Sequence, residues 1–139
     1  MIAAAFLTSA INADKTLEVG NNAPKIETVE GINVVNDANS AGKTRLISFW
    51  SPKNPESRIA NRNYSRIYGD TVSTDIEFIS ICTDSDEALM KEVMKIDGIN
   101  ASNNYAHSQI SQRTFKDYGV VHNPRAFLVS PDGTIEKIL

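Results

Sequence analysis

The chain has one cysteine among its 139 residues, and this scarcity is the first constraint on what it can do. A single thiol cannot close an internal disulfide, so no disulfide framework holds the fold, and Cys82 does not indicate a redox compartment. Histidine is also scarce. His107 and His122 are the only two, and they are not clustered with cysteine or acidic residues. The sequence therefore predicts no metal site and no cofactor.

The chain also lacks a strong charge bias and a long apolar run. It has 14 Lys and Arg against 17 Asp and Glu, which gives a formal net charge of −3. This charge provides no basic footprint for nucleic acid and no polybasic patch for a membrane surface. No apolar stretch is long enough for a stable membrane span. With 41% hydrophobic and 22% charged residues, the composition is that of an ordinary globular protein of one domain.

The first 13 residues are apolar and small, and a polar stretch begins at Asp14. A short hydrophobic run that ends in a small residue, Ala13, resembles the end of a secretory signal, although no Lys or Arg precedes it. The alternative is an N-terminal strand or helix that packs on the domain. We therefore divide the chain into a signal-peptide remnant over 1–13 and a domain over 14–139. This division favours an extracytoplasmic location, periplasmic or secreted, over a cytoplasmic one.

Two strands and a helix between them are the clearest elements in the sequence. Thr44–Trp50 and Ile76–Cys82 are compact β-prone runs, typical of buried central strands. Asn54 and Pro55 are residues that a helix favours at its N-cap and first position. The helix should end at Gly69, and its apolar residues recur at i, i+4, i+7 and i+8. They predict a buried face formed by Ala60, Tyr64, Ile67 and Tyr68.

A second helix and a C-terminal hairpin follow. Asp84 with Glu87 is a capping signature for a helix that stops at Asp97-Gly98. Its apolar residues are Leu89, Met90, Val93, Met94 and Ile96. The remaining elements are a loop at 98–106, a short helix at 110–118, and two strands at 126–130 and 134–139. This order predicts an α/β sandwich with parallel central strands.

Two segments resemble a known family. The first is F-W-S-P-K-N-P-E-S-R at 49–58, and the second is Y-G-V-V-H-N-P-R-A-F-L-V-S-P-D-G-T-I at 118–135. They resemble the thioredoxin superfamily, in particular its TlpA-like thiol-disulfide oxidoreductases and the related alkyl hydroperoxide reductase and thiol-specific antioxidant branch. In that family, Phe-Trp and three residues precede Cys-x-x-Cys, and a proline, usually cis, precedes a strand and an Asp-Gly turn.

The resemblance covers about residues 17–139. It implies a thioredoxin-like fold, in which helices flank a central mixed β-sheet. It also implies a final helix after the last strand, and we expect that helix to be absent because the sequence ends at Leu139.

Both cysteine positions of the family's motif hold other residues, Asn54 and Ser57. Disulfide exchange needs a thiolate nucleophile and a second thiol that resolves the mixed disulfide. An Asn amide has no ionisable proton, and a Ser hydroxyl is a far weaker nucleophile without a base beside it. Ala60 stands where the family often has an acidic residue. We therefore expect a redox-inactive domain rather than a working dithiol oxidoreductase.

The resemblance implies that a binding groove survives the loss of the cysteines. Pro124 takes the place of the family's cis-proline, beside which the backbone would bind an extended segment by strand addition. We predict that this groove binds a peptide, a protein or a small ligand. The groove residues would be Trp50, Asn54, Pro55, Asn123 and Pro124.

Two alternatives stay open. One is an oxidoreductase or antioxidant protein that acts through Cys82 or through a partner's thiols. The other is a structural domain that dimerises through an exposed sheet face, since the sequence does not fix the oligomeric state.

Three arginines, Arg58, Arg62 and Arg66, stand at i, i+4 and i+8 and share one face of the first helix. Such a stripe is usually a solvated face. Docking of an acidic partner is the alternative.

Overall fold

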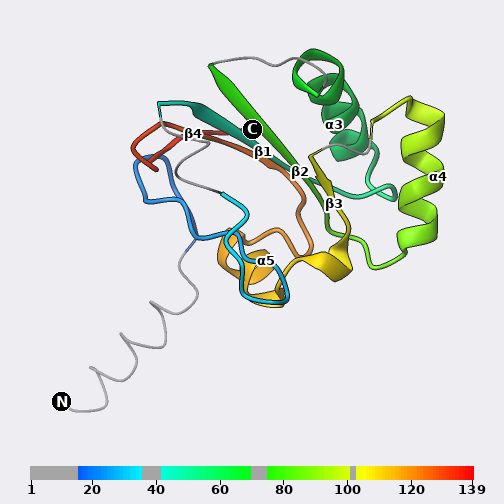
Figure 1. Cartoon of the computed structure of the whole chain (residues 1–139), viewed down its shortest axis with the longest axis horizontal. Coiled ribbons are helices and arrows are strands. Elements are labelled where there is room, and N and C mark those ends of the chain that lie inside the picture. Colours follow the sequence, from blue (N-terminus) through cyan, green and yellow to red (C-terminus); the bar gives the residue numbers. More distant parts are fainter. Residues whose placement is uncertain (1–15, 36–41, 70–74, 101–102) are drawn as a thin grey trace, which may run out of the picture.

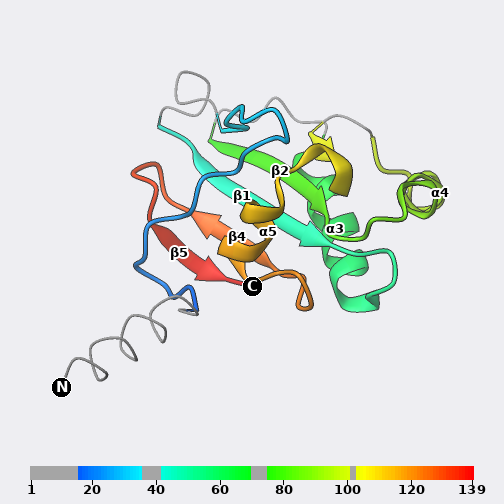
Figure 2. The same ribbon diagram turned by 90° about the horizontal axis from the view of Figure 1, so that it is seen from below.

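The computed structural model describes residues 16–35, 42–69, 75–100 and 103–139, and the signal-peptide remnant predicted at 1–13 lies outside them. In this part, five strands form one sheet in the order β3-β2-β1-β4-β5 (Figures 1 and 2). Strands β1 (Thr44–Trp50) and β2 (Ile76–Cys82) have the predicted bounds and pair in parallel along their whole length.

The other three strands make the sheet mixed, as expected. Strand β4 (Ala126–Val129) pairs antiparallel with β1, and β5 (Ile135–Ile138) pairs antiparallel with β4. Strand β3 (Asn104–Tyr105) pairs in parallel with β2, inside the segment predicted as a loop. Its two residues carry no apolar alternation, so only pairing with β2 defines it as a strand.

Helices cover both faces of the sheet (Figures 1 and 2). Helices α3 (Pro55–Tyr68) and α4 (Glu87–Asp97) lie on one face. Helix α5 (Gln112–Tyr118), the 3₁₀ helix His107–Gln109 and residues 16–35 lie on the other. The central strands are buried on both faces, which explains their near-continuous apolar sequence.

The core on the α5 face is aliphatic and aromatic. Phe49 of β1 packs against Phe115, Tyr118 and Phe127, with ring centroids 5.0 to 6.4 Å apart. The Tyr118 hydroxyl donates a hydrogen bond to the Pro24 carbonyl oxygen at 2.6 Å. This contact fastens the N-terminal segment to α5.

Most helix ends are where the sequence predicts them. Helix α4 ends at Gly98 and α5 at Gly119, and both glycines adopt left-handed conformations with φ of 68° and 65°. The start of α4 differs from the prediction. Its N-cap is Asp86, whose Oδ1 accepts a hydrogen bond from the Leu89 N–H at 3.1 Å. Asp84 lies before the helix, where its Oδ1 accepts from the Asp86 N–H.

Helix α3 buries a polar face, and the apolar face predicted for it is only partly buried, with Tyr64 and Tyr68 packed against the core. Its buried residues are Ser57, Asn61 and Ser65. Asn61 is fully buried, and its Oδ1 accepts a hydrogen bond at 2.8 Å from the hydroxyl of Ser80, which pairs with Ser48 across β1 and β2. A buried amide costs free energy where it is unpaired, and the Nδ2 of Asn61 has no hydrogen-bond partner, so the contact of Oδ1 with Ser80 is what holds this face of α3 against β2.

The residues predicted to be buried are displaced by this orientation of α3. Ala60, Tyr64 and Tyr68 are only half-buried, and Ile67 is 58% exposed. Of the apolar residues of α4, Met90, Val93 and Met94 are buried, whereas Ile96 is 71% exposed.

An ion pair fastens the end of α4 to the start of α3. The Nε and Nη2 of Arg58 donate to Oδ2 and Oδ1 of Asp97 at 3.0 and 2.9 Å. Only 3% of the Asp97 side chain is exposed. The hydrogen bonds from Arg58 lower the pKa of Asp97, and the charges of Arg58, Arg62 and Arg66 lower it further.

We predict that Asp97→Asn lowers the free energy of unfolding by about 2 kcal/mol, because it weakens two charge-assisted hydrogen bonds at a buried position. Asp117→Asn is the matched control. Its pair with Arg113 is exposed, with 3.5 Å between the atoms, and should contribute less than about 1 kcal/mol. Chemical denaturation of the three proteins measures both effects. Equal losses of unfolding free energy in the two variants would contradict the conclusion that the buried ion pair stabilises the fold more than the exposed one.

The same ion pair predicts an acid dependence. The pKa of Asp97 is lower in the folded state than in the unfolded chain. Its stabilising effect is therefore complete above the unfolded pKa and is lost as the pH falls through the folded value. Below about pH 4, the stability of the wild type should fall more steeply than that of Asp97→Asn.

Candidate functional site

The two positions where the family motif has cysteine lie at the start of α3, Asn54 just before the helix and Ser57 in its first turn. The Asn54 N–H donates to the Ser51 carbonyl at 3.0 Å, and Asn54 Oδ1 accepts from the Ser57 N–H at 2.9 Å. Asn54 is therefore the N-cap of α3, as predicted, and Pro55 follows it at the first helical position.

Ser57 is held by the turn that joins β1 to α3. Its Oγ accepts from the Ser51 N–H at 3.1 Å and donates to the Asn54 carbonyl at 3.0 Å. Only 7% of the residue is exposed. A carbonyl oxygen cannot remove the hydroxyl proton as a general base would, so this serine is not activated as a nucleophile. The hydrogen bonds of both residues serve to hold the turn.

The Asn123–Pro124 bond is trans, so the cis-proline that the resemblance implies is a wrong expectation. No peptide bond in the described segments is cis. The trans isomer is the intrinsically favoured form, by about 0.5–1 kcal/mol at an X–Pro bond. In this isomer the Arg125 carbonyl still accepts from the Phe49 N–H at 3.1 Å, which joins β4 to β1.

A hollow of about 170 Å³ lies between α3 and Pro124. Its apolar side chains come from β1, from α3, from the start of β4 and from the residue after β5, and three hydroxyls and two charged side chains lie with them. The lining residues are Ser48, Phe49, Glu56, Ser57, Ala60, Tyr64, Pro124, Arg125, Ala126 and Leu139. The hollow therefore adjoins the position where the cysteines are missing.

Of the five residues predicted to form the groove, only Pro124 lines this hollow. Asn54 and Pro55 directly precede the lining residues of α3, and Asn123 precedes Pro124. The structure contradicts a place for Trp50 in a surface groove, because its side chain is completely buried. It packs in a cluster with Cys82, Met90, Val93, Met94 and Ala106.

Sequence reasoning missed the α3 wall of the hollow. Ala60 and Tyr64 were recognised as apolar and assigned to the core, because periodicity alone does not show which face of a helix meets the sheet. The buried Asn61 was the available signal, since a polar residue within such a helix needs an internal partner.

Cys82 has the properties of a structural cysteine. It is fully buried, and its thiol is 3.6 Å from the Asp84 carbonyl oxygen, to which it donates. Burial raises the pKa of Cys82 to about 11. Because the thiolate is the reactive form, both burial and this pKa oppose nucleophilic chemistry at the residue.

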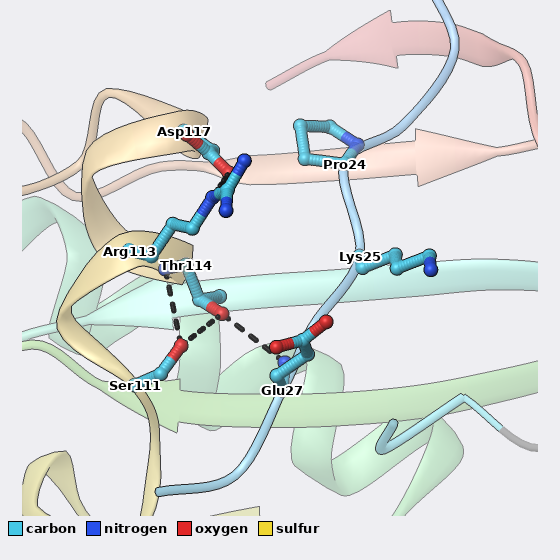
Figure 3. Close-up of a pocket in the computed structure, with 7 residues that line it drawn as sticks. All are labelled: Pro24, Lys25, Glu27, Ser111, Arg113, Thr114 and Asp117. Carbon is cyan, nitrogen blue, oxygen red and sulfur yellow. Dashed lines mark hydrogen bonds and ion pairs between the residues drawn. The ribbon is translucent and has the colours of Figure 1, made fainter. Parts of the chain in front are cut away.

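A larger hollow, of about 290 Å³, lies on the α5 face (Figure 3). Thr114 Oγ1 accepts from the Glu27 N–H at 3.1 Å, and the hydroxyls of Ser111 and Thr114 are 3.0 Å apart. Lys25 and Arg113 bring positive charge, and Glu27 and Asp117 bring negative charge. These contacts attach residues 24–27 to α5, and the balanced charges select no class of ligand.

The described residues hold no group of three or more His, Cys, Asp or Glu side chains that could bind a metal ion. The helices in the same segments are too short or too polar to traverse a bilayer.

Comparison with known proteins supports the fold. No protein-family model and no curated protein matches the chain. A thioredoxin-like protein from Parabacteroides distasonis is 24% identical over 88% of each chain, with a TM-score of 0.70. The thioredoxin domain of a thiol-disulfide oxidoreductase from Bacteroides vulgatus is 22% identical over 88% of this chain and 89% of that one, with a TM-score of 0.65.

A secreted disulfide oxidoreductase from Mycobacterium tuberculosis is 20% identical over 84% of this chain and 82% of that one, with a TM-score of 0.59. These likenesses span nearly the whole length of each protein and agree with the mixed sheet and its flanking helices. The chain therefore has a thioredoxin-like fold.

Proposed function

We propose that the chain is a redox-inactive thioredoxin-like domain that binds an extended segment of a protein partner in the hollow beside Pro124. The observation that carries this proposal is that the hollow adjoins a turn without thiols. A domain with this arrangement keeps a surface for binding and has no nucleophile for exchange.

The lining of the hollow supports an apolar ligand group. Ala60, Tyr64 and Leu139 are partly exposed around it, and the hydroxyls of Ser48 and Ser57 lie with them. The volume of about 170 Å³ equals that of roughly six water molecules, which suits one side chain of medium size. An extended peptide that inserts one such side chain would fit it.

The exposed loop before Pro124 supports contact with the backbone of a peptide. Val121, His122 and Asn123 are all exposed. We propose that Asn123 and the turn residues Asn54 and Pro55 form the rim of the site, where an extended segment meets exposed main chain.

The names of the solved neighbours fit this proposal. They include thiol-disulfide oxidoreductases and thiol:disulfide interchange proteins, and one of them is described as secreted. We propose an extracytoplasmic location for this chain on that basis and on the signal-like residues 1–13.

We predict that the purified protein does not reduce insulin disulfides with dithiothreitol above the rate of the reagent alone. Asn54→Cys/Ser57→Cys restores two thiols at a helix N-terminus, where the first thiolate is favoured, and should form a disulfide and gain activity. Ser57→Cys alone is the control, because one thiol cannot complete the cycle. Wild-type turnover comparable to that of an authentic dithiol oxidoreductase would refute the proposal.

Cys82 should react slowly with iodoacetamide in the folded protein. With a pKa of about 11, about 0.1% of the thiol is ionised at pH 8, and the side chain is also inaccessible. Labelling followed by mass spectrometry should be complete in denaturant and nearly absent without it. Rapid labelling of the native protein would instead favour a function that uses Cys82.

A peptide titration tests the binding site itself. The probe is insulin B chain with alkylated cysteines, which can bind but cannot exchange, and the readout is the amide NMR spectrum. Shifts should concentrate on residues 56–64 and 121–126. Ala60→Arg fills the hollow and should weaken binding by about tenfold or more, about 1.4 kcal/mol.

Ile59→Arg is the matched control for that titration. It adds the same side chain at the neighbouring position, which is 48% exposed and does not line the hollow. Equal weakening by both variants, or shifts spread over other surfaces, would contradict the proposed site.

A further inference from the structure

The edge of α3 that faces away from the hollow beside Pro124 has an excess of positive charge. Arg58, Arg62 and Arg66 follow one another at four-residue intervals along this edge. Both carboxylate oxygens of Asp97 accept hydrogen bonds from Arg58. Within the described residues, Arg62 and Arg66 form no ion pair, although both are close enough to lower the pKa of Asp97. One of the three charges is therefore neutralised and two are not.

A hollow of about 160 Å³ lies beside the second half of this stripe. The chain that follows α4 forms its other wall. The lining residues are Ser65, Arg66, Gly69, Gly98, Ile99, Asn100 and Asn104. Arg66 is exposed, so its guanidinium is accessible to a ligand that enters the hollow.

Two buried donors of α3 lack an acceptor: one belongs to Ser65, which lines the hollow, and the other to Arg62, one turn before Arg66. The Nε of Arg62 and the hydroxyl of Ser65 are buried, and neither has a hydrogen-bond partner. A buried donor without an acceptor destabilises the folded state, and like charges four residues apart in a helix also repel. A bound anion would relieve both effects.

We propose that this edge of α3 is a docking site for an acidic side chain, Asp or Glu, of a protein partner. Arg62 and Arg66 would hold the carboxylate. The contact between Arg58 and Asp97, one turn earlier, shows the same chemistry within the chain: a guanidinium of this stripe holds a carboxylate through two parallel hydrogen bonds.

Size and charge favour a carboxylate over a polyanion. The hollow has the volume of roughly five water molecules, which admits one acidic side chain. The net charge of −3 repels nucleic acid and acidic membranes as a whole. Two free arginines can attract one acidic residue locally without reversing this repulsion.

The acidic docking site is separate from the hollow beside Pro124. Ala60 and Tyr64 line that hollow, whereas Arg62 and Arg66 stand on the opposite edge of α3, across the buried Asn61 and Ser65. A partner could use both edges, but loss of one site does not remove the other.

Fluorescence anisotropy with two labelled, capped peptides tests the site. One peptide has four Glu residues spaced by Gly and Ser, and the other has Gln in their place. We expect the Glu peptide to bind at low salt and weaken as salt rises, and the Gln peptide not to bind. Arg62→Gln/Arg66→Gln should weaken binding about tenfold or more. Arg66→Gln alone, at an exposed position, should weaken it about threefold if the double variant fails to fold.

Arg113→Gln is the matched control, because this exposed arginine lies on α5 at the other face of the sheet. It should bind the Glu peptide as the wild type does. Amide shifts should fall on residues 62–69 and 98–100. The proposal is overturned if the wild type does not bind the Glu peptide at low salt, if the Gln peptide binds equally, or if the arginine variants bind like the control.

Discussion

A single buried contact, between Asn61 of α3 and Ser80 of β2, determines how the main helix of this domain presents its side chains. Asn61 has no exposed surface, and its Oδ1 accepts a hydrogen bond from the Ser80 hydroxyl, with 2.8 Å between the two oxygens. Turning α3 to bury its apolar residues would expose this amide and leave Ser80 without its acceptor. Because the polar face is held inward, an apolar edge of α3 lies toward Pro124 and a basic edge lies toward α4. The two proposed binding sites both follow from this rotation.

The turn before α3 shows how a thioredoxin-like fold can lose its thiols without losing its structure. A helix N-terminus with unsatisfied N–H groups favours a thiolate in a redox protein. Here the Oδ1 of Asn54 accepts a hydrogen bond from the Ser57 N–H. The hydroxyl of Ser57 accepts from the Ser51 N–H and donates to the Asn54 carbonyl oxygen. The same groups that would stabilise a reactive sulfur now stabilise the turn. Together these hydrogen bonds make Asn54 and Ser57 a stable start to α3.

Much of this fold can be predicted from local sequence rules. Strands β1 and β2 are continuous apolar runs, Asn54 and Pro55 start α3, and Gly98 and Gly119 end α4 and α5, because each of these signals acts within a few residues. Most failures involve contacts between distant segments, although the N-cap of α4 lies at Asp86, two residues after the predicted Asp84. The rotation of α3 depends on Ser80, β3 depends on pairing with β2, and the burial of Trp50 depends on packing against α4. The Asn123–Pro124 isomer was taken from a resemblance, and the residues themselves favour trans.

The two edges of α3 differ in what they can contribute to binding. The hollow beside Pro124 is mostly apolar and takes one side chain, so it would supply affinity through burial. The arginine edge is partly solvated, and exposed ion pairs contribute little affinity, but they select charge and orient a partner as it approaches. An extended segment with an apolar residue and an acidic residue on either side of α3 would satisfy both.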